Sequence, residues 1–292
     1  MRPPGTQSPR RGSEMRRGMH HGTHEPTDFG HHYDERAPVG DRYGGGQLHM
    51  WYWYGDDDPA SLPEAIERVS EKVVQALGVR PGERVLDAGC GTGGLALRLA
   101  REAGARVTGV TISRYEVRLA RERARDGPGA PDVEFLLGDF AHLPFPDASF
   151  DAVVALESLQ NAHDLDQVTA ELRRVLRPGG RLTLADLSRE SDTERARLKR
   201  FMASLALRRL PSLREWLQAL RRVGFEVEEY TQCGPRVYGR KNRFLRASLD
   251  RRGELAEELA EEDLLGYAVR HRGFFAARRD QIGYVIVSAR RP

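Results

Sequence analysis

The sequence is poor in cysteine and has no long hydrophobic run. Its 292 residues include two cysteines, Cys90 and Cys233, which lie far apart. Such a pair forms no disulfide framework and fits a reducing cytoplasm. No stretch of about 18 apolar residues is present, and no apolar segment follows the N-terminal arginines, which argues against a membrane span and a secretory signal. The sequence therefore predicts a cytoplasmic protein without a membrane partner.

The chain also lacks a strong charge of either sign. Lysine and arginine number 46 and aspartate and glutamate 43, for a net charge of +3. So small an excess is typical of a solvated basic surface, so we expect no nucleic-acid partner. Six of the nine histidines lie in residues 1–49, but no thiolate or fixed scaffold accompanies them. We therefore predict no metal site.

Aliphatic residues are almost missing from the beginning of the chain. Residues 1–42 are rich in glycine, proline, arginine and histidine, a composition that cannot bury a core. We expect this segment to be disordered and order to begin near Tyr43. The length of the remainder, 43–292, fits one catalytic domain of roughly 200–250 residues with additional segments.

The middle of the chain alternates short apolar runs with amphipathic helices. A helix is expected from Ser61, because Pro63 and Glu64 form a helix start. Five strands are expected, at Arg84–Ala88, Val107–Thr111, Val133–Leu137, Ala152–Leu156 and Arg181–Ala185. This order predicts a doubly wound α/β fold with a parallel sheet, which binds ligands at the carboxyl ends of its strands.

The last third has a different pattern. Residues 192–223 predict a basic amphipathic helix, and strands are expected at Phe225–Tyr230 and Ile282–Ala289. The mostly helical insertion 234–278 between them would form a lid over the strand ends. Its arginines, Arg240 and Arg243 among them, have two interpretations: they select an acidic acceptor, or they form the solvated face of a helix.

A glycine loop follows the first of these strands. Gly89, Gly91 and Gly94 match the G-x-G-x-x-G pattern of dinucleotide sites, so a nicotinamide or flavin enzyme is an alternative. Two features oppose it. The second strand ends Thr111-Ile112-Ser113, without the acid that a dinucleotide ribose needs. Asp87 precedes the glycines, where it would repel a pyrophosphate but suit the cationic amino group of an amino acid.

Several motifs together resemble those of a known enzyme family. They are Val85–Gly94, Gly138-Asp139-Phe140, Leu143–Asp147, Leu156-Glu157-Ser158-Leu159, Leu176–Gly180 and, outside the core motifs, Leu48–Trp53, Val107–Ser113 and Gly283–Pro292. With them the span from about Tyr43 to Arg291 resembles class I S-adenosylmethionine-dependent methyltransferases. It is similar in particular to bacterial natural-product enzymes of the rebeccamycin sugar O-methyltransferase type. The resemblance implies a mostly parallel seven-stranded sheet of the Rossmann-like methyltransferase fold.

The resemblance also implies the cofactor, S-adenosyl-L-methionine, and residues that would hold it. The methionine end would meet Gly89, Gly91, Gly93, Asp87, Leu156 and Glu157. Ile112 and Ser113 would lie at the adenine, Glu116 at the ribose hydroxyls, and Asp139 with Phe140 at the adenine amino group and ring. Tyr43 and Trp53 would lie near the cofactor, although the aromatic run at 51–54 fits equally well a staple onto the core.

The base that would deprotonate the acceptor is less defined. Relatives of the rebeccamycin type carry two histidines where this chain has Gln160-Asn161. We therefore predict His163 or Asp186 as the base. The expected reaction is O-methylation of a small molecule in specialised metabolism. C- or N-methylation, an anionic precursor, RNA or protein methylation and a non-catalytic binding protein remain as alternatives, and a homodimer is left open.

Overall fold

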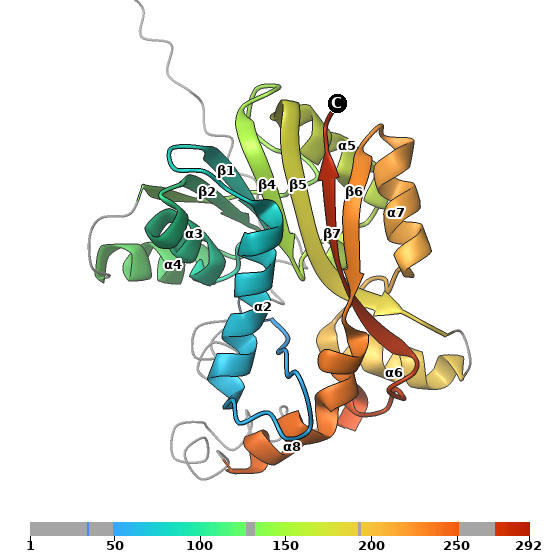
Figure 1. Ribbon diagram of the computed structural model, residues 1–292. Helices are drawn as coiled ribbons and strands as arrows, with labels where there is room; N and C mark the ends of the chain where they lie inside the picture. Colours follow the sequence, from blue (N-terminus) through green and yellow to red (C-terminus); the bar gives the residue numbers. More distant parts are fainter. Residues whose placement is uncertain (1–33, 35–48, 127–131, 192–193, 251–271) are drawn as a thin grey trace, which may run out of the picture.

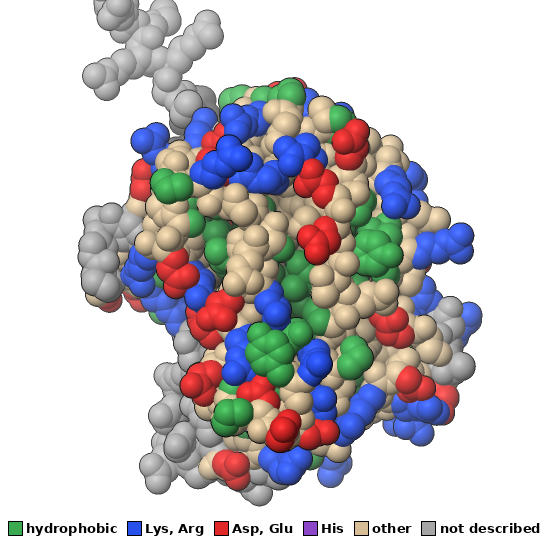
Figure 2. Space-filling model, viewed as in Figure 1, with side chains coloured by type: hydrophobic (Ala, Val, Ile, Leu, Met, Phe, Trp, Pro, Cys, Tyr) green, Lys and Arg blue, Asp and Glu red, His purple; other side chains and the backbone are tan. Residues whose placement is uncertain are grey.

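The computed structural model describes residues 34, 49–126, 132–191, 194–250 and 272–292. Tyr43, most of segment 1–42 and part of the predicted lid, 251–271, lie outside these residues. Among the helices in the described ranges, none is long and apolar enough to cross a membrane. Acidic and basic side chains are interspersed over the face that Figure 2 shows.

A twisted seven-stranded sheet forms the centre of the molecule (Figure 1). Its strands are β1 (Arg84–Ala88), β2 (Arg106–Thr111), β3 (Val133–Leu137), β4 (Phe150–Leu156), β5 (Leu176–Arg189), β6 (Glu226–Gln232) and β7 (Ile282–Arg290). The order across the sheet is β3-β2-β1-β4-β5-β7-β6. Strands β1 to β5 are parallel, and β7 is antiparallel to both β5 and β6. The predicted doubly wound, mostly parallel fold is confirmed.

Helices cover both faces of this sheet. One face carries α2 (Leu62–Leu77), α3 (Gly94–Ala103) and α4 (Arg114–Asp126), and the other carries α5 (Leu165–Val175) and α7 (Leu213–Arg222). Helix α2 begins as predicted, because Ser61 and Glu64 form a reciprocal capping box. Its Val69 and Val73, one turn apart, are buried and face the core. Each face of the sheet thus has its own hydrophobic layer.

The single helix predicted over 192–223 is wrong. Two helices occupy the described part of this range, α6 (Arg195–Leu205) and α7. The first ends at Ala206, whose φ of 54° is left-handed, and Pro211 follows before Ser212 caps α7. Because proline cannot donate a backbone hydrogen bond and restricts its predecessor, the amphipathic pattern continues in sequence while the helix does not.

Residues 49–60, called the strap here, lie with α6 and α8 (Lys241–Asp250) at the carboxyl ends of the parallel strands (Figure 1). Backbone hydrogen bonds join Tyr52 N to Ala65 O and Trp53 N to Arg236 O. Trp51 stacks on Phe244 with ring centroids 4.0 Å apart. The side chains of Trp51 and Trp53 are buried, so these two rings of the aromatic run pack into the core, whereas Tyr54 is exposed.

Candidate active site

Most of the predicted site residues lie along one edge of the sheet, because neighbouring parallel strands end there. The loop after β1 carries the glycines, the loop after β2 carries Ile112 and Ser113, and the loop after β3 carries Asp139. Glu157 follows β4, and Asp186 lies near the end of β5. Five adjacent strands in the order β3-β2-β1-β4-β5 thus present these groups along one edge, where ligands of doubly wound sheets bind.

The glycine loop after β1 requires residues without a side chain. Gly89, Gly91 and Gly93 have φ values of 89°, 51° and 86°, all left-handed. A Cβ on Gly89 would lie 2.3 Å from Ser158 Cβ, and one on Gly93 would lie 2.7 Å from Phe135 Cζ. The loop therefore keeps its backbone open toward the N-terminus of α3.

Asp87 lies on β1 just before this loop. Its side chain is almost fully buried, and its Oδ2 receives no hydrogen bond in the structure. Burial raises the pKa of this carboxyl to about 7. A buried carboxylate oxygen without a donor is costly, and an ammonium group reaching it would remove that cost. The residue therefore fits the amino group of S-adenosylmethionine.

The end of β2 carries a small hydrogen-bonded cluster. Thr111 Oγ1 donates to Glu116 Oε2 at 2.5 Å, so the carboxylate lies at the end of β2. Glu116 N donates to Ser113 Oγ at 3.1 Å, and Ser113 Oγ donates to Asp34 Oδ1 at 2.5 Å. Asp34, from the segment predicted to be disordered, also accepts from Tyr115 N at 3.0 Å. The sequence predicted no acidic residue at the end of β2, but Glu116 on α4 places a carboxylate there.

The end of β3 places Asp139 and Phe140 beside the β2 loop. Asp139 Oδ1 accepts from Ala141 N at 2.8 Å, which is a turn contact. The other oxygen, Oδ2, lies 3.9 Å from His142 Nδ1, and the side chain is about half exposed. Phe140 is partly buried against the hydrophobic layer of the α5 face. The turn contact leaves Asp139 Oδ2 on the accessible side.

Glu157 follows β4 with an unusual backbone and two strong contacts. Its φ is 49°, a left-handed value that glutamate rarely adopts, and its N–H donates to Ala185 O at 2.8 Å. Its Oε1 accepts from Met50 N at 2.7 Å and from Tyr284 Oη at 2.9 Å. Burial raises the pKa of this carboxyl to about 7, and the two donors oppose the shift. Oε2 receives no hydrogen bond from the described residues.

Asp186 and Gln160 lie next to this carboxyl. Asp186 is nearly inaccessible, and its oxygens accept from Gln160 N at 3.2 Å and Leu187 N at 2.9 Å. Burial raises the pKa of Asp186 well above its usual value, and the Glu157 charge adds to the shift. The side chain of Gln160 donates to Glu157 O at 3.3 Å, while its buried Oε1 has no donor. Asp186 thus holds the backbone of the turn that presents Gln160.

His163 lies on the surface beyond this turn. Its ring Nε2 contacts the Arg208 guanidinium, and its carbonyl accepts from Arg209. The environments of the two predicted bases therefore differ: Asp186 is buried and already hydrogen-bonded, and His163 is exposed beside cations.

The arginines of the predicted lid contact the strap. Arg240 forms an ion pair with Asp56. The Arg243 guanidinium carbon lies over the Trp53 ring, 5.0 Å from its centroid. The Arg243 guanidinium also donates to the carbonyls of Gly55, Asp56, Asp58 and Ala60. Both guanidinium groups thus contact the strap, while Arg240 Nε is buried without a partner among the described residues. The interpretation that Arg240 and Arg243 select an acidic acceptor stays a prediction.

Sequence reasoning missed the part of the site that comes from distant segments. Tyr284 lies on β7 and Met50 on the strap, yet both donate to Glu157. His49 bridges the strap to α2, with Nε2 2.9 Å from Ser70 Oγ, and burial lowers its pKa to about 4. The sequence signal was present in the Gly283–Pro292 motif, but only the antiparallel placement of β7 brings Tyr284 to this edge.

Comparison with known sequences places this geometry in a family. A family model described as a methyltransferase domain matches residues 86–184. The chain is 35% identical over 282 residues to 27-O-demethylrifamycin SV methyltransferase of Amycolatopsis mediterranei, covering 91% of this chain and 98% of that relative. It is 36% identical to O-methyltransferase cnsE of Penicillium expansum, covering 84% and 91%.

Solved structures of other proteins share this fold. The [4+2]-cyclase SpnF superposes with a TM-score of 0.78 at 30% identity, covering 90% of this chain and 95% of that one. A geranyl diphosphate C-methyltransferase from Streptomyces coelicolor, solved with S-adenosyl-L-homocysteine, shares the fold with a TM-score of 0.75 at 21% identity, covering 92% and 100%. Because a relative that is 35% identical spans nearly its whole length, the chain belongs to the S-adenosylmethionine-dependent methyltransferases.

Proposed function

We propose that this enzyme methylates a hydroxyl oxygen of a small molecule of specialised metabolism. The single observation that carries the reaction type is the Glu157 carboxyl at the end of β4, whose Oε2 accepts no hydrogen bond from the residues that the structure describes. The names of the two sequence relatives support the same reaction, since both are O-methyltransferases. C- or N-methylation stays as the alternative.

The cofactor would lie along the ends of β1 to β4. Asp87 would accept from its amino group, which fits the buried oxygen that lacks a donor. Glu116 would meet the ribose hydroxyls and Asp139 Oδ2 the adenine amino group, because carboxylates accept from both. The remaining contacts would come from the backbone or apolar side chains of Gly89, Gly91, Gly93, Ile112, Ser113, Phe140 and Leu156. Trp53 would contribute only indirectly, by holding the strap in place, because its indole N–H already donates to Ala60 O.

Glu157, expected from the resemblance to border the methionine end of the cofactor, would instead be the base. When bound, S-adenosylmethionine supplies an electrophilic methyl group on a sulfonium sulfur. Glu157 Oε2 would take the hydroxyl proton of the acceptor while the hydroxyl oxygen bonds to the methyl carbon. The carbon–sulfur bond would break at the same time, leaving its electron pair on sulfur as a neutral thioether. A carboxyl with a pKa near 7 is suited to this, because it is partly ionised at neutral pH and still basic. Tyr284 and Met50 hold its Oε1 and thereby aim Oε2.

Neither base predicted from the sequence deprotonates the acceptor in this proposal. Asp186 would position Gln160 rather than touch the acceptor, because backbone N–H groups occupy its oxygens. Gln160 Oε1, buried without a donor, would accept from a polar group of the acceptor. His163, the other base predicted from the sequence, lies exposed beyond the turn that carries Gln160 and has no role in the proposal.

The test is methyl transfer from labelled S-adenosylmethionine to a panel of hydrophobic acceptors with free hydroxyl, amine or activated carbon positions. Label in an ether linkage supports the proposal, and label only on nitrogen or carbon refutes it. Tight cofactor binding without transfer to any acceptor would instead favour a reaction of the cyclase kind named for SpnF.

We also propose the cytoplasm as the compartment and no nucleic-acid partner. The structure has Cys90 and Cys233 as free, buried thiols, which suits reducing surroundings. Fractionation of the native host that places the protein outside the cytoplasm would contradict this.

A further inference from the structure

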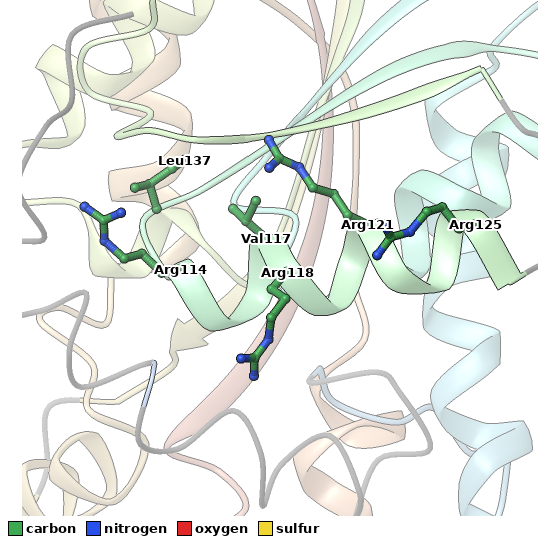
Figure 3. Close-up of a pocket in the computed structure, with 6 residues that line it drawn as sticks. All are labelled: Arg114, Val117, Arg118, Arg121, Arg125 and Leu137. Atoms are coloured by element: carbon green, nitrogen blue, oxygen red, sulfur yellow. The ribbon is translucent and has the colours of Figure 1, made fainter.

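A cavity of about 320 Å³ lies along α4 and the end of β3, and Figure 3 shows the six residues that line it. Its walls are Arg114, Val117, Arg118, Arg121, Arg125 and Leu137. The four arginines are spaced by four, three and four residues, a pattern that keeps them along one side of a helix. Among the residues that the structure describes, no acidic one lines this cavity.

The positive charge of this cavity is poorly compensated. Arg118 has a carboxylate near it, Glu122, but at 4.0 Å. Within the described ranges, no carboxylate pairs with Arg114 or Arg125, and both side chains are exposed. Elsewhere, Arg98 contacts Glu67 and Glu102, and Arg174 contacts Glu171. Like charges one turn apart on a helix destabilise it, so an anion would stabilise α4 here.

One of the four arginines is already held in place. Arg121 donates through Nε and Nη2 to Phe135 O on β3, at 3.1 and 2.7 Å. These bonds leave its charge intact and fix its guanidinium at the wall of the cavity. Arg123, from the same helix, instead reaches Thr92 Oγ1 at 2.5 Å and does not line the cavity. The cavity therefore combines one fixed guanidinium with three exposed ones, of which Arg118 also lies 5.2 Å from the centroid of the Tyr115 ring.

We propose that this cavity binds a small molecule that carries two or three linked phosphate groups. Arginine grips phosphate in bidentate fashion, and each phosphate group offers several acceptor oxygens. The stripe extends over 12 residues of helix, and its ends are roughly 16 Å apart at about 1.5 Å per step, so one phosphate cannot meet all four guanidinium groups. Val117 and Leu137 supply an apolar wall for the organic part of such a ligand. The site does not depend on the proposed methyl transfer.

Inorganic triphosphate is the probe, measured by calorimetry on the full chain at about 0.15 M salt, where weak surface attraction is screened. The test variant is Arg118→Gln with Arg125→Gln. Its matched control is Arg101→Gln with Arg221→Gln, which removes the same charge from exposed positions on α3 and α7. We expect at least tenfold weaker binding in the test variant and no change in the control. Unchanged thermal unfolding of the free variant would show that it folds.

A chemical footprint locates the ligand independently. Triphosphate should protect Arg118 and Arg125 from phenylglyoxal, as read by mass spectrometry, and leave Arg101 reactive. No binding by the wild type, or equal weakening in both double variants, would overturn the proposal. It would also be overturned by an oligonucleotide that binds the same arginines far more tightly than triphosphate, since the ligand would then be a nucleic acid.

Discussion

At the scale of single residues, the burial of Asp87 makes cofactor binding dependent on pH. The pKa of its carboxyl is raised to about 7, and only the ionised form attracts an ammonium group. We expect the affinity for S-adenosylmethionine to rise with pH up to about 7, by at most tenfold per unit, and then to level off.

Asp87→Asn should bind the cofactor at least tenfold more weakly, about 1.4 kcal/mol, and without this pH dependence. The asparagine keeps the volume of the side chain, so packing around β1 is preserved. Calorimetry across this pH range checks both effects. The same slope in the variant would show that another group controls binding.

Glu157→Gln separates catalysis from binding. Glutamine keeps an oxygen that can accept from Met50 N and Tyr284 Oη, but it cannot take a proton. We expect kcat/KM to fall by about 10²–10⁴, with the cofactor Kd nearly unchanged. In the wild type, kcat/KM should rise with pH until about 7, because Glu157 must be ionised.

Tyr284→Phe provides the complementary measurement. It removes one donor to Glu157 Oε1, so the pKa of the Glu157 carboxyl should rise. The rise of kcat/KM with pH should then occur at higher pH. If Glu157→Gln instead keeps the wild-type kcat/KM, Glu157 is excluded as the base.

At the scale of elements, the strap depends on α8 for its position. Arg243 donates to four strap carbonyls and lies over Trp53, whereas Arg246, on the same helix, is exposed. Arg243→Gln should lower the free energy of unfolding by about 1–3 kcal/mol, since it leaves partly buried carbonyls without a donor. Arg246→Gln is the matched control, with an expected change within about 0.5 kcal/mol.

Thermal unfolding and the KM of the acceptor check this effect together. A strap that loosens should raise KM and lower Tm in the same variant. A raised KM with unchanged Tm would mean that Arg243 touches the acceptor directly, contrary to the contacts of its guanidinium.

The elements best predicted from sequence were those whose pattern is local. The capping box at Ser61, the strands β1 to β5 and the glycine loop follow from spacing and composition alone. The end of α6 at Ala206 was not predicted, because apolar residues continue at helical spacing on both sides of it. The strap contacts of Arg243 and the link from Tyr284 to Glu157 join residues more than 100 positions apart, which periodicity cannot reveal.

At the scale of the whole molecule, the cofactor should stabilise the fold selectively. A ligand at 100 times its Kd adds about 2.7 kcal/mol to the free energy of unfolding. S-adenosylmethionine should therefore raise Tm by several degrees, and NAD should leave it unchanged. Thermal unfolding with each ligand is the measurement.

Gly91→Val should abolish the shift, because its φ of 51° and the close approach of the cofactor exclude a branched side chain. Gly82→Ala is the control, since Gly82 also has a left-handed φ, 80°, but nothing lies within 4 Å of the added Cβ. A Tm rise with NAD alone would refute the assignment of the cofactor.

The placement of β7 between β5 and β6 has a consequence for the folding pathway. Arg181 on β5 is paired with Arg290 on β7, so α6, α7, β6 and α8 all lie within the loop that this pairing closes. Until β7 docks, β5 ends the parallel sheet with an open edge, and β6 has no strand to join. Closing so long a loop is slow, and open strand edges invite association with other chains. We therefore expect the late folding intermediate to aggregate at high protein concentration, and refolding yield to depend on dilution.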